Sequence, residues 1–199
     1  MIVVVAAVKG GVGKTTSSVY LAALAAGRRA VTIVDADPQA AAAEWVEYSE
    51  DERLTKISVV EAPTDRLITR ALDRLDDDQV VIIDTPAAHD RLLGKLIERS
   101  DVVVIPTRVG GIEPARVETV LGMLPEGKPA GLVITSARTF TRDYQETLAT
   151  WTQARVPVWG TVPERVAIAA GPTRPLFEDG LEAYKKVWRK IQAAARSSA

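Results

Sequence analysis

The sequence contains no cysteine and only one histidine, His89. Without thiols, the chain has no disulfides, no thiolate zinc sites and no cysteine nucleophiles. A single imidazole does not make a histidine metal site, so we expect His89 to be an ordinary loop residue. A reducing compartment is compatible with this composition but does not follow from it.

Aromatic residues and long apolar runs are also scarce. Aromatic residues make up 5% of the chain, and the four tryptophans are scattered, which favours core positions over a platform for stacked bases. The apolar start "MIVVVAAV" has no basic segment before it, is too short to cross a bilayer and continues into a glycine loop. We therefore expect no signal peptide, no transmembrane helix and a cytoplasmic location.

The length and the charge distribution indicate one soluble domain with a basic C-terminal part. A chain of 199 residues with 47% hydrophobic and 26% charged residues suits a single globular domain over residues 1–199. The formal net charge is −1, but residues 128–199 hold 11 Lys and Arg against 6 Asp and Glu, whereas residues 1–127 hold 14 against 20. The C-terminal part is therefore suited to contact a polyanion.

Short apolar runs alternate with segments of helical period along the whole chain. The predicted strands are Ile2–Val8, Ala30–Asp35, Ile57–Glu61, Val80–Asp84, Val102–Pro106, Gly131–Thr135 and Val156–Val162. The predicted helices are Lys14–Ala26, Gln39–Ser49, Asp65–Leu75, Asp90–Arg99, Glu113–Leu124, Arg142–Gln153 and Leu181–Ala195.

This alternation predicts an α/β fold with a mostly parallel central sheet flanked by helices on both faces. Runs such as "IVVVAAV" and "QVVIID" are apolar at consecutive positions, as expected for strands that helices cover on both sides. In such sheets ligands bind at the carboxyl ends of the strands.

The stretch "VKGGVGKTT", residues 8–16, follows the first predicted strand and has the form of a phosphate-binding loop. Gly10, Gly11 and Gly13 allow the backbone N–H groups to turn toward phosphate oxygens. Lys14 adds a positive charge, Thr15 offers a hydroxyl to Mg²⁺, and the next helix presents its N-terminus to the anion. A plain glycine turn is the alternative, but such turns seldom end in Gly-Lys-Thr between a buried strand and a helix.

Acidic residues follow two other strands. Asp35 and Asp37 stand two apart in "VDADPQ", so both carboxylates can face the phosphate end of the sheet. Asp84 ends the apolar run "VVIID", which has the form of a Walker B strand whose aspartate holds a water of the Mg²⁺ shell. Acidic residues at strand ends can also be helix caps, but three features at successive carboxyl ends favour one Mg²⁺·nucleotide site.

Together these motifs resemble the ParA/MinD superfamily of ATPases. In the pattern G-x-x-x-x-G-K-[ST] the first glycine would stand at Val8, whereas the chain is similar to the deviant form K-G-G-x-G-K-[ST] of that family. "DADPQ", "IIDTP", "VVVIPTRVGGIEPARV" and "GTVPERVAIAAGPTRPLFE" extend the likeness over nearly the whole chain, which most resembles short, ParF-like partition proteins. Ala7 and Tyr20 depart from the family pattern. Because the sequence starts directly at the first strand, we expect no N-terminal helix-turn-helix and no transcriptional autoregulation.

The resemblance implies ATP and Mg²⁺ as cofactors and gives each motif residue a role. Thr15 would ligate Mg²⁺ directly, and Asp35 and Asp84 would act through water. Asp37 would position the attacking water and, with Lys9 and Lys14, form the catalytic set. The implied nucleotide-binding residues are Lys9, Gly10, Gly11, Val12, Gly13, Lys14, Thr15, Thr16 and Pro163, and the adenine is expected near Thr135, Ser136, Pro163 and Glu164.

Lys9 is the lysine that, in this family, reaches the nucleotide of a second subunit in an ATP-dependent dimer. Two ammonium groups about 7 Å apart repel by roughly 2 to 3 kcal/mol at an effective dielectric constant near 20. A triphosphate offsets this repulsion better than a diphosphate, so ATP would favour the dimer more than ADP. The alternative is a surface lysine at a turn.

Hydrolysis is expected to be slow, because the sequence shows neither a water-orienting glutamine nor an identifiable cis arginine finger. NTPases without such groups turn over at roughly 10⁻⁴ to 10⁻² per second. The resemblance implies acceleration by a ParB-like or analogous adaptor protein.

The family also implies non-specific DNA binding by the ATP dimer, through phosphate contacts that do not depend on sequence. Each candidate can equally be a solvated charge. The candidates are Arg138, Arg142, Arg165, Arg174, Lys185, Lys186, Arg189 and Lys190.

The last predicted helix carries an apolar stripe opposite its basic face. Such a helix can lie on a membrane, as the tail of MinD does. We instead expect the stripe to pack on the sheet. The stripe consists of Leu181, Tyr184, Trp188 and Ile191, with Val187 beside it.

The function predicted from the sequence is therefore a partition ATPase that acts in plasmid or chromosome segregation. It would work in the cytoplasm on the nucleoid, with itself, DNA and an adaptor as partners and no membrane. There are two alternatives. One is a MinD-like membrane-associated ATPase, and the other is a ParA-like positioner of a protein cargo such as a carboxysome or chemosensory cluster. A metabolic P-loop enzyme is disfavoured because no motif suggests a second substrate.

Overall fold

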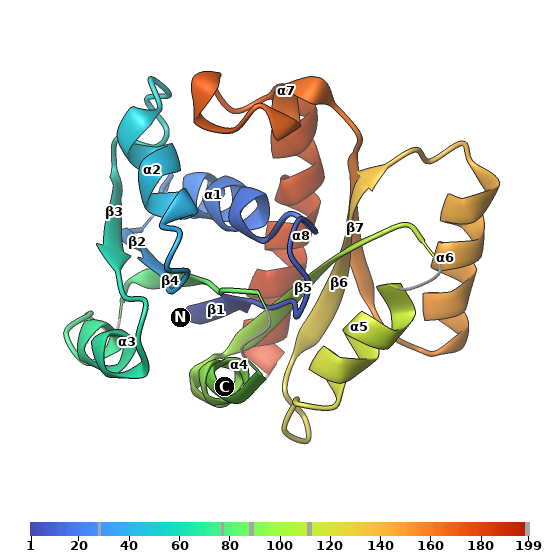
Figure 1. The fold of residues 1–199 in the computed structure, drawn as a ribbon, viewed down its shortest axis with the longest axis horizontal. Helices are drawn as coiled ribbons and strands as arrows, with labels where there is room; N and C mark the ends of the chain where they lie inside the picture. The colour runs from blue at the N-terminus through green and yellow to red at the C-terminus, as the bar shows by residue number, and fades with distance from the viewer. Residues whose placement is uncertain (28, 77, 88–89, 111–112, 198–199) are drawn as a thin grey trace.

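The fold is a parallel seven-stranded sheet in the part of the chain that the structure describes. The computed structural model describes residues 1–199 except 28, 77, 88–89, 111–112 and 198–199. The strand order is β3-β2-β4-β1-β5-β6-β7, so β1, which leads into the glycine loop, lies at the centre (Figure 1). The strands are β1 (Ile2–Val5), β2 (Val31–Asp35), β3 (Ile57–Glu61), β4 (Val80–Asp84), β5 (Val102–Arg108), β6 (Ala130–Ala137) and β7 (Val158–Pro163).

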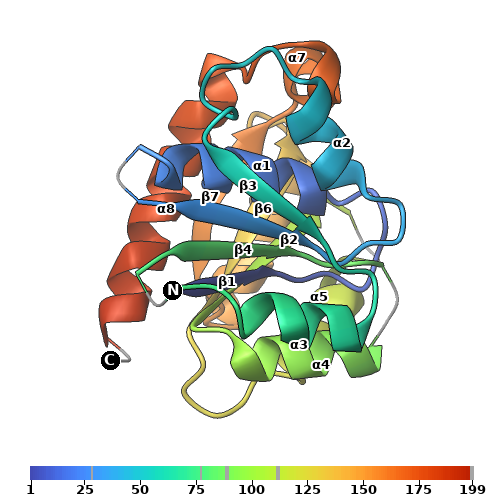
Figure 2. The same cartoon turned by 90° about the vertical axis from the view of Figure 1, so that its left-hand side faces the viewer.

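Helices cover both faces of this sheet. Helices α1, α2 and α8 lie on one face and α3, α4 and α5 on the other, with α6 beside the β6–β7 edge (Figures 1 and 2). The helices are α1 (Lys14–Ala25), α2 (Ala41–Tyr48), α3 (Asp65–Leu72), α4 (Asp90–Arg99), α5 (Glu113–Leu121), α6 (Arg142–Gln153), α7 (Val166–Ala169) and α8 (Glu178–Ser197), with a 3₁₀ turn at Gly171–Thr173.

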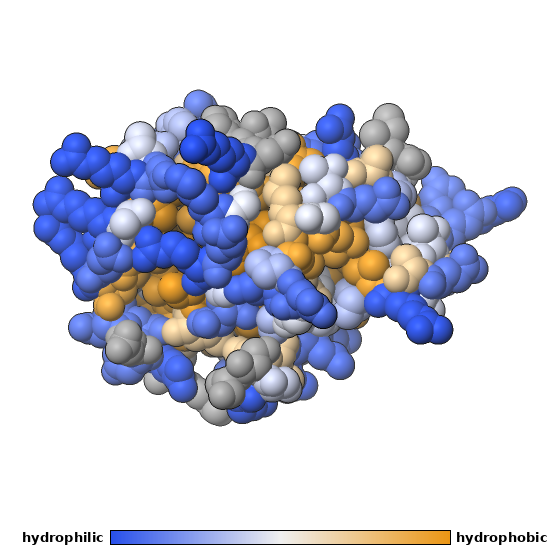
Figure 3. Space-filling model, turned by 90° about the horizontal axis from the view of Figure 1, so that it is seen from below, coloured by the Kyte–Doolittle hydropathy of each residue, from blue (hydrophilic) through white to orange (hydrophobic). Residues whose placement is uncertain are grey.

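Alternate residues of the central strand enter opposite cores. Val3 and Val5 pack in the core beneath α1 and α8, whereas Val4 packs with the helices of the other face, and all three are fully buried. Burial on both faces explains why the strand is apolar at every position. On the side of the molecule covered by α3, α4 and α5, hydrophilic side chains cover much of the surface and apolar residues show between them (Figure 3).

The strand register brings the predicted acidic residues together. Asp84 at the end of β4 pairs in register with Val5 of β1 on one side and with Asp35 of β2 on the other. Both aspartates therefore lie at the carboxyl edge of the sheet, next to the loop that leaves β1. The predicted fold class and the predicted location of the site relative to the sheet agree with this arrangement.

Several predicted boundaries differ from the structure. Strand β1 ends at Val5 rather than Val8, because the chain turns into the loop, and Ala6 keeps only an N–H bond to the Val104 carbonyl, at 2.8 Å. Strand β5 continues past Pro106 to Arg108. Helix α8 begins at Glu178 rather than Leu181, with acidic residues in its first turn that suit the helix dipole. The short α7 is absent from the prediction because four residues carry no readable period.

The apolar stripe of α8 is part of the core. Leu181, Tyr184, Val187 and Ile191 are buried, and Trp188 is partly buried against the same cluster. This is the packing that the sequence analysis favours over a membrane-bound helix. Among the described residues, no helix is long and apolar enough to cross a membrane.

Candidate nucleotide-binding site

The glycine loop has the backbone shape that phosphate binding requires. Gly11 and Gly13 have φ of 73° and 89°, in the left-handed region that side-chain-bearing residues seldom adopt. Helix α1 begins directly after Gly13, so its N-terminal N–H groups face the loop. The Thr135 hydroxyl, which lies 2.8 Å from the Val12 carbonyl and 3.0 Å from the Thr107 carbonyl, ties the loop to the neighbouring strands.

A cavity of about 350 Å³ is lined by residues of this loop. It brings together most of the residues predicted for phosphate and adenine, but Lys9, Val12, Asp35, Asp84 and Glu164 are not in its lining. The lining consists of Gly10, Gly11, Gly13, Lys14, Thr15, Thr16, Asp37, Ala87, Arg108, Thr135, Ser136, Val162, Pro163, Ile168, Ala169 and Tyr184.

Lys14 is the charged group buried most deeply in the lining. It is 7% exposed, and its ammonium donates to the Lys9 carbonyl at 3.1 Å. Burial lowers the pKa of Lys14, and the nearby carboxyl groups of Asp84 and Asp37 oppose that shift. A buried ammonium that points into a cavity is suited to hold an anion.

Asp84 has the burial and the hydroxyl neighbours expected of a carboxylate that binds a cation. It is fully buried and accepts hydrogen bonds from the Thr15 hydroxyl at 2.7 Å and the Ser18 hydroxyl at 2.9 Å. Burial raises its pKa to about 7, against the effect of these two bonds. A hydroxyl beside a carboxylate is an oxygen donor set that Mg²⁺ prefers, so these residues fit the predicted metal.

Asp35 and Asp37 lie in different surroundings. Asp35 is fully buried and its carboxylate accepts the backbone N–H groups of Asp37, Ala42 and Ala43 at 2.9–3.1 Å. Burial raises the pKa of Asp35 in spite of these bonds. This carboxylate therefore stabilises the start of α2, and its predicted contact with metal-bound water stays a prediction. The partly buried Asp37 lines the cavity.

Lys9 does not line this cavity. Its side chain is 47% exposed, and its ammonium forms an ion pair with the carboxylate of Glu113, the first residue of α5. The two lysines of the loop thus have opposite environments, because Lys14 is buried at the cavity and Lys9 is held at the outer edge.

Comparison with known proteins identifies the family. Residues 3–176 match the CobQ/CobB/MinD/ParA nucleotide binding domain. The chain belongs to this family.

Two proteins are similar to this chain in sequence. The chain is 34% identical over 193 residues to the maintenance of carboxysome distribution protein A of Gloeobacter kilaueensis, covering 96% of this chain and 77% of that protein. It is 36% identical over 110 residues to protein ParA of Rhizobium radiobacter, covering 54% of this chain and 48% of that protein.

A solved structure shares the fold. A plasmid partition protein of Borrelia burgdorferi B31, bound to AMPPNP, superposes with a TM-score of 0.77 at 20% identity, over 96% of this chain and 98% of that one. These findings confirm the predicted ParA/MinD resemblance, fold class and ATPase, and they agree with ATP and Mg²⁺ as cofactors.

Sequence reasoning missed Arg108, which the structure places in the lining of the cavity of this ParA/MinD-family protein. The sequence prediction identifies no cis arginine finger, and its fifth strand ends at Pro106. The strand in fact runs to Arg108, which pairs in register with Thr135 of β6, so this residue reaches the carboxyl edge of the sheet. A longer strand prediction would have exposed this signal.

The departure at Tyr20 from the family pattern is explained by a buried aromatic pair. The rings of Tyr20 and Tyr184 stack with centroids 5.2 Å apart. The Tyr20 hydroxyl accepts the Phe177 N–H at 3.0 Å, and a Cβ on Gly180 would lie 2.6 Å from the Tyr20 ring. Tyr20 therefore joins α1 to α8, with glycine required opposite it.

Tyr184 also connects α8 to the loop. Its hydroxyl lies 2.8 Å from the Ser17 hydroxyl, which donates to the Gly13 carbonyl at 2.7 Å. Burial raises the pKa of Tyr184, so the side chain is neutral. The nucleotide loop and the C-terminal helix thus share one hydrogen-bonded chain.

The candidate DNA-binding residues fall into two groups. Four form ion pairs, namely Arg138 with Glu164, Arg142 with Glu146, Arg165 with Asp179 and Lys185 with Glu182. Glu164, predicted near the adenine, is occupied in the first of these pairs. Among the described residues, the other four candidates have no ion pair. These are Arg174, Lys186, Arg189 and Lys190.

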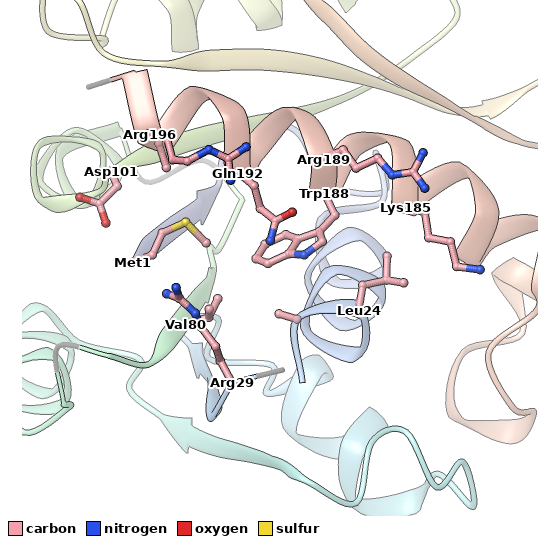
Figure 4. A pocket seen from close by; sticks show the side chains of 12 residues that line it. Met1, Leu24, Arg29, Val80, Asp101, Lys185, Trp188, Arg189, Gln192 and Arg196 are labelled. Carbon is pink, nitrogen blue, oxygen red and sulfur yellow. The ribbon is translucent and has the colours of Figure 1, made fainter. Parts of the chain in front are cut away.

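A larger cavity, of about 710 Å³, lies at the opposite, amino end of the sheet. The Trp188 ring points into it from α8, between Met1 and Leu24 (Figure 4). Four cations line it together with one acidic residue, Asp101. The cations are Arg29, Lys185, Arg189 and Arg196.

No cluster of three or more potential metal-binding His, Cys, Asp or Glu side chains occurs among the described residues. His89 lies outside the described residues, so its predicted loop position has no structural counterpart here.

Proposed function

We propose that this chain is a ParA-type positioning ATPase that forms a dimer when it binds ATP. The observation that carries the proposal is the contrast between its two loop lysines. Lys14 is buried at the cavity, where it can hold the phosphates of its own subunit, whereas Lys9 is half exposed and lies outside the cavity lining. A half-exposed lysine beside a phosphate loop is suited to the phosphates of a second subunit.

The residues of the cavity supply binding and orientation for hydrolysis. The loop N–H groups, Lys14 and Thr15 would hold the phosphates, and Mg²⁺ bound near Thr15 and Asp84 would neutralise their charge. Asp37, which lines the cavity, would orient the attacking water. Removing the carboxylate in Asp37→Ala should therefore preserve ATP binding and accumulate the ATP-bound dimer.

Slow hydrolysis would determine how long the ATP-bound dimer persists. ATP binding forms the dimer, and hydrolysis to ADP removes the charge that draws Lys9 across the interface. A ParB-like or analogous adaptor that completes the site would set the lifetime of the dimer.

Non-specific DNA is the proposed surface on which the dimer acts. Lys186, Arg189 and Lys190 are exposed on α8, have no ion pair among the described residues, and fit phosphate contacts that release counterions. The apolar stripe of the same helix is buried, which supports DNA over a membrane as the partner.

Two cargoes are candidates. ParA similarity supports the segregation of a plasmid or chromosome, but it covers 54% of the chain. Similarity to the carboxysome-distribution protein covers 96% of the chain, which supports a protein cargo as the second candidate. An adaptor that stimulates ATP turnover separates them, because a partition adaptor binds a specific DNA site and a protein-cargo adaptor binds the cargo.

The direct experiment measures binding to a duplex of arbitrary sequence by fluorescence anisotropy with ATP, ADP or no nucleotide. Affinity should appear with ATP and Mg²⁺, and should fall by a factor of a thousand or more between about 50 and 200 mM salt if roughly six or more phosphates are contacted. Equal binding with ATP and ADP would contradict the proposal.

A parallel sedimentation assay with anionic lipid vesicles tests the membrane alternative. Deleting α8 would open the core, so point substitutions are the better probe. ATP-dependent lipid binding without DNA binding would replace the DNA proposal with a MinD-like one.

A further inference from the structure

The Lys9–Glu113 ion pair joins two segments 104 positions apart in the chain. Lys9 lies in the glycine loop after β1, and Glu113 is the first residue of α5, which follows β5. The pair is asymmetric, because the Lys9 side chain is 47% exposed and the Glu113 side chain only 7%. The carboxylate is therefore the member that depends more on its partner.

Glu113 has one ion-pair partner among the described residues, and it is Lys9. Its backbone N–H donates to the Gly110 carbonyl at 3.3 Å, which fixes the start of α5 beneath the loop. A nearly buried carboxylate without a counter-ion is strongly disfavoured. Moving Lys9 away from Glu113 thus has a free-energy cost within its own subunit.

Lys9 is held at a second point. Its backbone carbonyl accepts a hydrogen bond from the Lys14 ammonium at 3.1 Å. A phosphate oxygen would compete with this carbonyl for the same ammonium. Binding of a nucleotide in the cavity would therefore loosen the loop around Lys9 while the side chain is still paired with Glu113.

We propose that Glu113 is a positioning residue that retains Lys9 in its own subunit until the phosphates of a second subunit compete for it. This inference rests on the proposed function, because it assumes that Lys9 crosses the dimer interface. Glu113 then sets the protein concentration at which the ATP dimer forms. A dimer would appear only when ATP is present in both subunits, and premature capture of other anions by Lys9 would be suppressed.

The first test measures the availability of Lys9 in the nucleotide-free monomer. Lysine acylation with an N-hydroxysuccinimide ester is followed site by site with mass spectrometry. Glu113→Gln, which keeps the shape but removes the charge, should raise labelling of Lys9 roughly threefold, the range expected for a partly exposed pair. Labelling of the exposed Lys56 should not change.

The second test measures dimerisation by sedimentation with AMPPNP and Mg²⁺. Glu113→Gln should lower the protein concentration for half-dimerisation roughly tenfold relative to wild type. Glu118→Gln removes the same charge from an exposed position on the same helix and serves as the matched control, with no expected shift. A thermal melt of each variant verifies folding.

The outcomes separate the two proposals. If wild type dimerises and Glu113→Gln dimerises equally or more weakly, the role of Glu113 is overturned and the proposed function stands. If Glu113→Gln alone dimerises, the role of Glu113 is supported more strongly still. If neither protein dimerises at any concentration, the proposed function fails and the competition for Lys9 fails with it.

Discussion

The two ends of the sheet carry cavities of opposite character. The cavity at the carboxyl end is about 350 Å³ and is built from glycines, a buried lysine, hydroxyls and Asp37. The cavity at the amino end is about 710 Å³ and combines apolar residues around Trp188 with four long cationic side chains. The smaller cavity is the one that we propose as the nucleotide site.

The two cavities differ in their polar groups as well as in their volume, and the proposed nucleotide site is the one with convergent buried polar groups. At the carboxyl end, the buried Lys14 and Asp84 are held by hydrogen bonds and have shifted pKa values. At the amino end, Arg189 and Arg196 are exposed and unpaired among the described residues, as in a surface that attracts a polyanion.

The largest expected effect is at the carboxyl end. Lys14→Ala removes the buried ammonium and should weaken ATP binding by about 100-fold or more, since charged contacts to phosphates are worth roughly 2 to 5 kcal/mol. Lys9→Ala is the control and should leave monomer affinity nearly unchanged. Titration with a fluorescent ATP analogue measures both, and an equal loss would refute the division between the two lysines.

The pH dependence of Mg²⁺·ATP binding should be the next largest effect. Burial raises the pKa of Asp84 to about 7, above the value near 4 of a free aspartate, so the folded protein holds this proton more tightly than the unfolded chain. The resulting stabilisation is fully present below about pH 4 and is lost as the pH rises through 7.

Mg²⁺ requires the ionised carboxylate and therefore shows the opposite trend. Affinity for Mg²⁺·ATP should rise about fivefold from pH 6 to 7, reach about tenfold in total by pH 8, and level off there. Calorimetric titrations at several pH values measure this, with Asp84→Asn as the comparison. If the affinity for Mg²⁺·ATP depends on pH in the same way in Asp84→Asn, the dependence arises from another group.

A moderate effect is expected at the amino end. Arg189→Gln should weaken ATP-dependent DNA binding a few-fold and reduce the salt dependence of log K by about one unit, without changing ATP affinity. Arg142→Gln is the control, because Arg142 is already paired with Glu146 and should matter less. Equal effects on DNA binding from both variants would remove the distinction between paired and unpaired cations.

An effect of similar size is expected for the connection between the two ends. Tyr184→Phe removes the hydrogen bond to Ser17 and should weaken ATP binding about two- to tenfold, the range for one neutral hydrogen bond. Tyr144→Phe removes a similar bond, 3.0 Å long, to Thr161 and should leave ATP binding unchanged. ATP titrations on both variants test this, and an unchanged affinity in Tyr184→Phe would mean that α8 is not coupled to the loop.

Most residues of the predicted phosphate site lie together in the structure, because the sequence signals that they carry act through local rules. Glycines with positive φ, a lysine at the start of a helix and acidic residues at strand ends each have a direct chemical meaning, and Gly13, Lys14 and Asp37 do line one cavity. The central parallel sheet followed from strands that are apolar at every position.

Contacts between residues far apart in the chain could not be predicted from these local signals. The pairing of Lys9 with Glu113 depends on how α5 starts beneath the loop, and the role of Tyr20 depends on Gly180 in a helix 160 positions away. Arg108 reached the cavity because its strand runs two residues longer than its apolar run. Asp35 was assigned to the metal, whereas its strongest contacts in the structure are with α2.

Sedimentation velocity of wild type and Lys9→Ala tests the central claim most directly. Wild type should be a dimer with AMPPNP and Mg²⁺ and a monomer with ADP, whereas Lys9→Ala should remain a monomer with both while still binding AMPPNP. Dimerisation of Lys9→Ala at the wild-type concentration, or a monomeric wild type saturated with AMPPNP, would contradict the claim that the half-exposed lysine makes this ATPase a dimer switch.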